Sequence, residues 1–269
     1  MIHKPFAEDT RMNPITADEY DAVVPKWIEW KSFPWGKLVY RISRFNIDRN
    51  LGSRKCKILD VGGGNGFNSI YFAKQGHSVT LLDYSPVMLS EARQAAEREG
   101  LTDKITFCQA DVSQIQDLFQ EQRFDLIICH LMIEFVQDPQ GALKNICTLL
   151  APNGLLSVLD ANRYSEVYRK AFQANDLAAA DQLIDIKEYF HPWFNRQTPL
   201  FSSADMIEIL REGGCTPIGD CGVLCLCAYL PNEPKYDLEY YQSLEQLELK
   251  LTNTYPYPLL ARFYQVLVQ

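Results

Sequence analysis

The sequence lacks any long apolar run and has few cations for its length. No stretch of about 18 apolar residues occurs, which argues against a transmembrane helix. The segment Met1 to Pro5 lacks the apolar run that opens a secretory signal. Lysine and arginine total 26 against 34 aspartate and glutamate residues, a net charge of −8 that disfavours a nucleic-acid partner. We therefore expect a cytoplasmic protein with no membrane partner.

The sequence also lacks the paired cysteines and histidines of a typical metal site. Cys225 and Cys227 would share one face of a strand and Cys221 precedes them, but no histidine or second close cysteine pair accompanies them. Most of the eight cysteines lie in apolar runs, where a free thiol behaves as a small hydrophobic group in a reduced protein. We expect these cysteines to pack in the core and expect no metal.

Apolar runs of strand length alternate with helical patterns through the middle of the chain. The predicted strands cover residues 57–61, 77–83, 105–109, 124–129 and 154–159. Ser85, followed by Pro86, predicts the start of a helix that continues to Glu99. This alternation indicates βαβ units and a mostly parallel sheet with helices on both faces.

The flanking segments break this alternation. Residues 1–50 predict a helical leader with Trp27, Trp30 and Trp35, and residues 161–200 predict an aromatic-rich insertion after the fifth strand. The rest of the chain predicts helices over 203–212 and 238–253 and strands over 215–230 and 262–269. We expect one domain over 1–269, with a cofactor-binding core at 55–160. Its fold class is α/β, a Rossmann-like doubly wound seven-stranded sheet, mostly parallel with an antiparallel last strand.

A glycine-rich loop follows the first predicted strand. It reads Asp60-Val61-Gly62-Gly63-Gly64-Asn65-Gly66. Glycines at such a turn let the backbone approach a ligand closely. A dinucleotide-binding loop needs a further glycine where Phe67 stands, and Asp60 would repel a pyrophosphate. The carboxylate of Asp60 suits a ligand that carries an ammonium group.

Acidic residues end the second and third predicted strands. Asp83 is placed to accept hydrogen bonds from a ribose, and the alternative is that it only caps the helix that begins at Ser85. Tyr84 and Met88 are candidates to line an adenine site. The third strand ends at Ala110-Asp111-Val112, where the carboxylate is either an adenine contact or an ordinary loop acid.

These segments, in this order, resemble the class I S-adenosylmethionine-dependent methyltransferase family. The match runs through residues 58–66, 82–85, 109–112, 124–127 and 149–154. The resemblance implies that the glycine loop holds the amino-acid end of S-adenosyl-L-methionine, the second-strand acid its ribose and the third-strand acid its adenine. It also implies S-adenosyl-L-homocysteine as product.

A narrower resemblance is to the bacterial tRNA carboxymethoxyuridine methyltransferases. It rests on residues 129–139, on Gly36-Lys37-Leu38 and on the tail from 240 to 265. The resemblance implies that His130 touches the cofactor. A leader arginine of that family falls at Val39, so Arg41 or Lys37 would have to replace it, and the family's basic run is missing from 186–193.

His130 and Glu134 follow the fourth predicted strand at the sheet edge where ligands bind. His130 is either a cofactor or substrate contact or a structural histidine, and Glu134 either faces the same cleft or is a solvated acid. Aromatic residues of the leader and the insertion are candidates for a lid, or simply pack together. They are Tyr20, Trp27, Trp30, Trp35, Tyr40, Tyr189, His191, Trp193 and Phe194.

The methyl acceptor remains open at this level. A carboxylate acceptor needs no base and would be held by Arg163, Arg196 or Arg41. A hydroxyl or amine needs a base, for which His191 and His130 are the candidates. Our first hypothesis is a small-molecule acceptor. The second is the carboxyl group of a tRNA wobble uridine, which the net charge disfavours, and the third is a non-catalytic cofactor-binding protein. The sequence does not indicate the oligomeric state.

Overall fold

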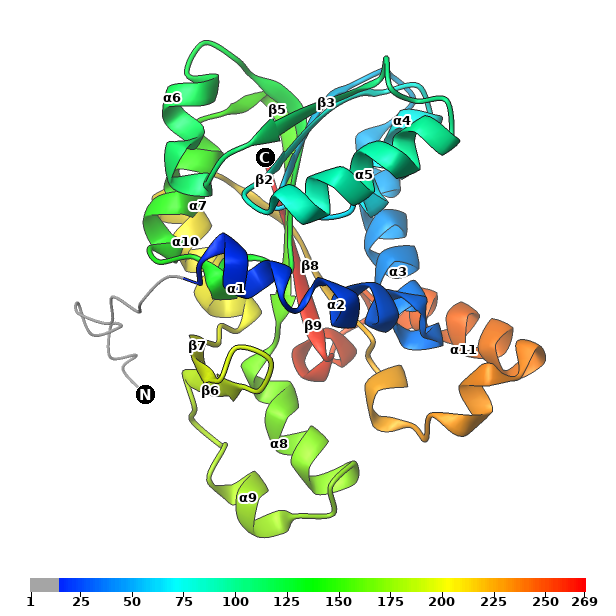
Figure 1. The fold of residues 1–269 in the computed structure, drawn as a ribbon. Coiled ribbons are helices and arrows are strands. Elements are labelled where there is room, and N and C mark those ends of the chain that lie inside the picture. The colour runs from blue at the N-terminus through cyan, green and yellow to red at the C-terminus, as the bar shows by residue number, and fades with distance from the viewer. Residues whose placement is uncertain (1–14) are drawn as a thin grey trace.

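A seven-stranded sheet forms the centre of the molecule, which a computed structural model describes over residues 15–269 (Figure 1). In spatial order the strands are β3 (Ile105–Gln109), β2 (Ser78–Asp83), β1 (Lys57–Val61), β4 (Phe124–His130), β5 (Leu150–Ala161), β9 (Phe263–Val268) and β8 (Pro217–Val223). Strands β1 to β5 pair in parallel, and β9 runs antiparallel to both β5 and β8. The predicted fold class is confirmed.

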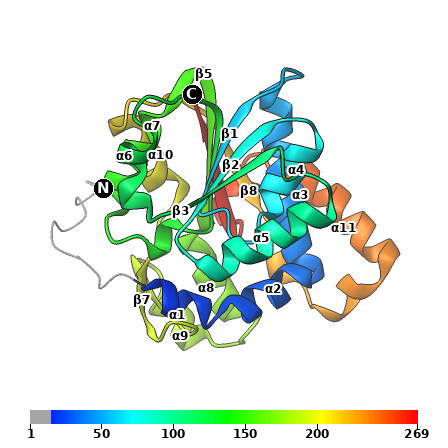
Figure 2. The ribbon, with the colours of Figure 1, turned by 45° about the horizontal axis from the view of Figure 1, so that its top comes forward.

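Helices cover both faces of this sheet (Figure 2). One face carries α3 (Pro34–Leu51), α4 (Phe67–Lys74) and α5 (Pro86–Arg98), and the other carries α6 (Ile115–Phe119), α7 (Pro139–Cys147) and α10 (Ser203–Glu212). Ile58 packs into the core of the first face and Leu59 into that of the second, because successive strand residues point to opposite faces. Burial on both faces explains why the strands read as unbroken apolar runs.

The leader and the insertion lie outside the sheet, as predicted. The described part of the leader contains α1 (Ala17–Asp21), α2 (Val24–Ser32) and α3, and residues 1–14 of the predicted leader fall outside the described residues. The insertion contains α8 (Arg163–Phe172), α9 (Leu177–Asp181) and a hairpin of β6 (Glu188–His191) and β7 (Arg196–Pro199). Five 3₁₀ helices complete the described elements: η1 (Val112–Gln114), η2 (Ile133–Phe135), η3 (Cys227–Tyr229), η4 (Glu233–Tyr236) and η5 (Tyr257–Leu260).

The strand predicted over 215–230 is too long. Strand β8 ends at Val223, because Leu224 takes a left-handed conformation with φ of 60°. Beyond it, the buried carboxylate of Glu248 in α11 (Leu238–Leu251) accepts hydrogen bonds from three successive backbone N–H groups. They belong to Cys225, Leu226 and Cys227, at 2.7, 2.8 and 2.7 Å. These hydrogen bonds to a side chain take the place of the backbone hydrogen bonds that a continuing strand would make.

The three cysteines near this turn are free and buried. Cys221, Cys225 and Cys227 belong to three separate hydrophobic clusters. Burial raises the pKa of the Cys221 thiol to about 11, so this thiol stays protonated near neutral pH. Within residues 15–269, no helix has both the length and the apolar character needed to cross a bilayer.

Candidate cofactor and active site

Two adjoining cavities lie where β1, β2, β3 and β4 end. The larger has a volume of about 410 Å³ and the smaller about 30 Å³. Tyr20 and Gly62 line both, so the cavities meet at the junction of leader helix α1 and the glycine loop. A ligand that occupied both would cross the ends of the central strands, the position at which open α/β sheets bind ligands.

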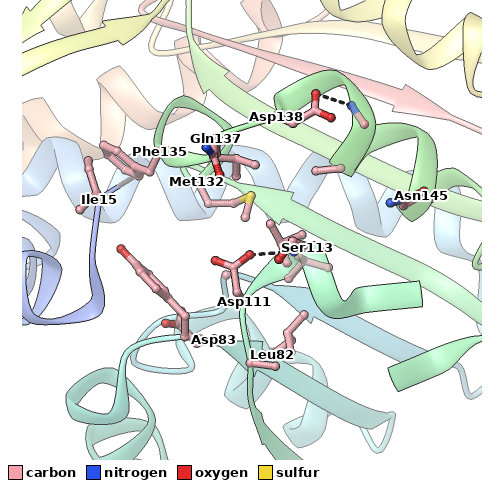
Figure 3. Close-up of a pocket in the computed structure, with 18 of the residues that line it drawn as sticks. Ile15, Leu82, Asp83, Asp111, Ser113, Met132, Phe135, Gln137, Asp138 and Asn145 are labelled. Carbon is pink, nitrogen blue, oxygen red and sulfur yellow. Dashed lines mark hydrogen bonds between the residues drawn. The ribbon is translucent and has the colours of Figure 1, made fainter. Parts of the chain in front are cut away.

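The larger cavity collects the residues predicted at the ends of β2 and β3 (Figure 3). They are Asp83, Tyr84, Ala110, Asp111 and Val112. The opposite wall comes from the segment after β4 and from α7, and the leader closes one side. These further lining residues include Ile15, Met132, Phe135, Gln137, Asp138 and Asn145, none of which the sequence singled out as ligand contacts.

The carboxylate of Asp83 is held at the base of this cavity. Its Oδ2 accepts from the backbone N–H of Gly64 at 2.8 Å, and its Oδ1 accepts from that of Ser85 at 2.9 Å. Burial raises the pKa of Asp83, and these two N–H groups oppose that rise. The cap of α5 is the hydroxyl of Ser85 itself, which accepts from Met88 N at 3.0 Å. Asp83 is therefore more than a helix cap, because it also fixes the glycine loop and faces the cavity.

Asp111 lies at the exposed side of the same cavity. It caps η1 by accepting from Ser113 N at 2.8 Å, and Gln114 reaches back to its backbone N–H. One carboxylate oxygen is used in this way, so the side chain still has lone pairs that can accept from a ligand.

The glycine loop forms one wall of the smaller cavity. Asp60, Gly63 and Gly64 line it together with Gly62. Gly62 has φ of 64°, and an added Cβ would lie 2.9 Å from Met132 Cβ, so both conformation and space require glycine there. Burial raises the pKa of Asp60 to about 6, while Ser69 Oγ, which donates at 2.7 Å, and the nearby Lys31 lower it.

The cation at this loop is Lys31 of α2. Its Nζ donates to Asn65 Oδ1 at 2.8 Å and lies 3.6 Å from where a Cβ on Gly64 would stand. Trp27, one helical turn earlier, lines the same cavity. Arg41, which the sequence favoured, is not among the lining residues and instead pairs with Glu245 at 2.8 Å. Packing of the leader thus brings Lys31, not Arg41, to the loop.

His130 lines the smaller cavity at the end of a buried polar chain. Its Nε2 lies 2.7 Å from Ser157 Oγ, which accepts from Gln265 Nε2 at 2.9 Å. Gln265 Oε1 in turn accepts from Asn46 Nδ2 at 2.8 Å. Since Gln265 already donates to Ser157, we assign the Ser157 proton to His130 Nε2, which leaves the ring proton on Nδ1. Burial, with Arg44 nearby, lowers the pKa of His130 to about 3.

Besides Arg41, three predicted site residues are not among those that line the cavities. His191 is buried in an aromatic cluster with Phe135 and Phe194, and burial lowers its pKa to about 4. Met88 packs in the core that joins the leader to α5, and Gly66 starts helix α4. None of the three is among the residues that line the cavities.

Glu134 is buried beneath the insertion rather than exposed to solvent. Its Oε2 accepts from the hydroxyl of Tyr189 at 2.9 Å, and its backbone N–H donates to Asp160 Oδ2 at 3.2 Å. Burial and the neighbouring Asp160 raise the pKa of Glu134 to about 8. Glu134 is thus a buried anchor for the β6–β7 hairpin and is not among the residues lining the cavities.

Leader and insertion pack together over the site. Tyr20 stacks on Phe194 with ring centroids 5.9 Å apart, and Trp27 meets Trp193 edge to face at 4.8 Å. Arg196 of the hairpin donates to the carboxylate of Glu19 in α1. The predicted packing of leader aromatics on insertion aromatics is therefore present, and their role as a lid stays a prediction.

Two residues that line the cavities have a buried polar atom without a partner among the described residues. Tyr84 of the larger cavity has its hydroxyl in this state, and Trp27 of the smaller cavity its indole Nε1. A buried polar group without a hydrogen bond costs about 1–3 kcal/mol, so both atoms favour a polar ligand. The larger volume lies within the usual range for small-molecule sites. An acid at each end, close-packed glycines and these two atoms fit S-adenosylmethionine.

Comparisons with known proteins agree with this geometry. Residues 53–222 match the family model described as a methyltransferase domain. The tRNA 5-carboxymethoxyuridine methyltransferase of Escherichia coli K12 is 30% identical over 235 residues, which cover 86% of this chain and 87% of that protein. A ubiquinone biosynthesis O-methyltransferase of Actinobacillus pleuropneumoniae is 38% identical over 115 residues, which cover 42% of this chain and 48% of that protein.

Solved structures share the fold at low sequence identity. An S-adenosylmethionine-dependent methyltransferase from Mesorhizobium loti aligns with a TM-score of 0.59 at 16% identity, covering 86% of this chain and 99% of that one. The [4+2]-cyclase SpnF aligns with a TM-score of 0.64 at 15% identity, covering 97% and 98%. The chain belongs to the S-adenosylmethionine-dependent methyltransferase family. It is an enzyme whose methyl donor is S-adenosylmethionine.

Proposed function

We propose that this enzyme methylates the carboxylate of 5-carboxymethoxyuridine in tRNA. The observation that carries the proposal is the extent of the match to the Escherichia coli enzyme of that name. A continuous match over 86% of the chain includes residues 161–200 wherever it begins, whereas the match to the ubiquinone-pathway enzyme covers less than half of the chain. Residues 161–200 contain the hairpin that packs with the leader, so the similarity extends to the segment that we propose faces the acceptor.

The lining of the two cavities supports an assignment of residues to the parts of the cofactor. We propose that Asp83 accepts from the ribose hydroxyls, and that Tyr84 and Ala110-Asp111-Val112 contact the adenine from the larger cavity. In the smaller cavity, Asp60 and the loop Gly62-Gly63-Gly64 face the amino-acid end. Lys31 supplies the cation for its carboxylate, and Trp27 Nε1 supplies a further donor.

A carboxylate acceptor agrees with the histidines at the site. When bound, S-adenosylmethionine supplies a methyl group on a sulfonium, which a carboxylate oxygen can take without losing a proton. Such transfer needs alignment of the reacting atoms and exclusion of water, which the packed leader and hairpin supply. The lowered pKa values of His130 and His191 make either imidazole a poor base. We assign His130 to positioning, through a donating Nδ1–H.

The expected small-molecule acceptor remains the second candidate. A net charge of −8 favours it, because a protein that binds a phosphate backbone usually carries the opposite charge. A carboxylate or hydroxyl oxygen of a free metabolite would then take the methyl group.

Transfer of label separates the two candidates. The enzyme is incubated with S-adenosylmethionine tritiated on the methyl group and with either bulk bacterial tRNA or a small-molecule extract. Incorporation into tRNA supports the proposal. Incorporation into the extract alone overturns it in favour of the second candidate, and incorporation into neither, with cofactor binding intact, overturns both.

A further inference from the structure

A row of buried polar side chains crosses the sheet next to the smaller cavity. His130 of β4 pairs with Leu159 of β5, and Leu159 pairs with Gln265 of β9, so these residues lie in register across three strands. Ser157 of β5 points to the same face as Leu159, which follows it by two residues. Ser157 and Gln265 are fully buried. Because a buried polar group costs stability unless it is hydrogen-bonded, the direction of each bond in this row is tightly set.

The amide of Gln265 fits its surroundings in one orientation. Its Nε2 lies 3.0 Å from the backbone carbonyl oxygen of Ser43, which can only accept, so this atom is the donating NH₂ group. Its Oε1 accepts from Asn46 Nδ2 at 2.8 Å. Asn46 is oriented in turn, because its Oδ1 lies 3.1 Å from the guanidinium of Arg49, which can only donate. Donation therefore runs in one direction, from Arg49 through Asn46 to Gln265.

The second hydrogen of the Gln265 amide sets the direction of the Ser157 hydroxyl. Gln265 Nε2 donates to Ser157 Oγ at 2.9 Å, and the other partner of this hydroxyl among the described residues is His130 Nε2, at 2.7 Å. The proton of Ser157 therefore points to His130 Nε2, and the ring proton of His130 lies on Nδ1. This Nδ1 has no hydrogen-bond partner among the described residues, and His130 lines the smaller cavity. A donor is thus left for a ligand.

We propose that Gln265 is a positioning residue that acts through Ser157 to fix the tautomer of His130, so that Nδ1–H is offered to a carboxylate in the smaller cavity. The inference deepens the proposed function and rests on it, since that function brings a carboxylate from the amino-acid end of the cofactor or from the acceptor. The opposite tautomer would present the Nδ1 lone pair and repel such an oxygen. With the donor fixed beforehand, the ring needs no rearrangement when the ligand binds.

Nitrogen NMR of the full chain, labelled with ¹⁵N-histidine and free of ligand, reads the tautomer directly. The chain has four histidines, and the signals that disappear in His130→Gln identify those of His130. Near neutral pH, the unaltered protein should show a protonated Nδ1 and an unprotonated Nε2. Gln265→Met and Ser157→Ala should each make the Nε2–H form appear, because each removes the hydrogen bonds that exclude it. An Nε2–H tautomer in the unaltered protein, or the same Nδ1–H tautomer in both variants, overturns the inference.

Thr252→Val is the matched control for these variants. Thr252 is equally buried, and its Oγ1 accepts from Asn46 Nδ2 at 2.8 Å. Its replacement disturbs the same polar cluster without interrupting the chain of donors that leads to His130. The variant should lose stability in urea and keep the Nδ1–H tautomer. A change of tautomer as large as that in Gln265→Met would show a general loosening of the cluster and would overturn the role of Gln265.

Binding and kinetics then identify the carboxylate. If it belongs to the cofactor, Ser157→Ala should weaken binding of S-adenosylhomocysteine about 2- to 10-fold and leave 5′-methylthioadenosine unaffected, since affinity falls with the population of the binding form. If it belongs to the acceptor, binding of S-adenosylhomocysteine should be unchanged, and KM for the acceptor should rise by about the same factor with kcat less affected. If the tautomer changes and neither value does, the contact with a carboxylate is contradicted.

The failure of this inference is distinguishable from that of the proposed function, because the tautomer is read without an acceptor. Transfer of methyl label to a small molecule alone overturns the proposed function and leaves the role of Gln265 standing. Transfer of label to tRNA by an enzyme whose His130 carries its proton on Nε2 has the opposite meaning.

Discussion

Lys31 Nζ donates to Asn65 Oδ1 at 2.8 Å, which ties the leader helix α2 to the glycine loop. The same ammonium group lowers the pKa of the buried Asp60 and Asp83 carboxyls. The leader thus contributes a positive charge to the glycine loop, which we propose holds the amino-acid end of the cofactor. Because Lys31 balances two buried acids, we expect its loss to affect the amino-acid end of the cofactor most.

Lys31→Met should weaken the binding of S-adenosylhomocysteine by about 10- to 100-fold, the loss expected for a hydrogen bond to a charged group. Binding of 5′-methylthioadenosine, which lacks the amino-acid end, should change by less than about twofold. Calorimetry with both ligands measures the difference. Arg41→Met is the matched control, because Arg41 pairs with Glu245 away from the cavities. Equal losses for both ligands would contradict the assignment.

Asp83→Ala should weaken S-adenosylhomocysteine binding by about 100-fold or more while leaving the protein folded. The variant removes a ribose acceptor and also frees the Gly64 N–H that Asp83 now binds. Asp111→Ala, at the exposed side of the same cavity, should have a smaller effect. Titration calorimetry gives the affinities and circular dichroism checks the fold. Unchanged affinity of the Asp83 variant for S-adenosylhomocysteine would contradict the assignment of Asp83 to the ribose.

The pH dependence of methyl transfer tests the role of His130. With a pKa of about 3, its ring stays neutral from about pH 5 to pH 8, so kcat should show no step near the ordinary histidine value of about 6.5. Single-turnover rates with saturating cofactor measure this profile. A loss of rate with unit slope below about pH 6.5 would show instead that a titrating imidazole acts in the reaction.

The buried Glu134 should make stability depend on pH. Its pKa of about 8 means that the folded protein keeps a proton that the unfolded chain releases above about 4.5. The stability that the folded protein has with Glu134 protonated is therefore complete below about pH 4.5. It is lost as the pH rises to about 8. Glu134→Gln can still accept from Tyr189 and cannot ionise. As the pH rises from 5 to 8, its free energy of unfolding should therefore increase by about 2–4 kcal/mol relative to that of the unaltered protein. Urea unfolding of both proteins at pH 5 and at pH 8 measures this change. If the two proteins differ in stability by the same amount at both pH values, the burial argument is contradicted.

Local patterns were sufficient to predict the parallel strands, the helix that begins at Ser85 and the acids at the strand ends. These features depend on short-range alternation and capping. The end of β8 could not be predicted, because Glu248 lies more than twenty residues from the N–H groups it binds. Lys31 was missed for the same reason, since only the packing of the leader brings it to Asn65. Arg41 was favoured from the narrower family resemblance, as a replacement for the arginine that falls at Val39, and its partner Glu245 is 204 residues away.

The most direct test of the proposed acceptor is nucleoside analysis of tRNA that carries 5-carboxymethoxyuridine. After incubation with the enzyme and methyl-labelled S-adenosylmethionine, the tRNA is digested to nucleosides. The nucleosides are separated and their masses are measured by mass spectrometry. We predict that the label appears in the methyl ester of this nucleoside and is released as methanol by mild alkali, as expected for an ester. Label in an alkali-stable position, or no label in tRNA while a small molecule is methylated, would contradict the account.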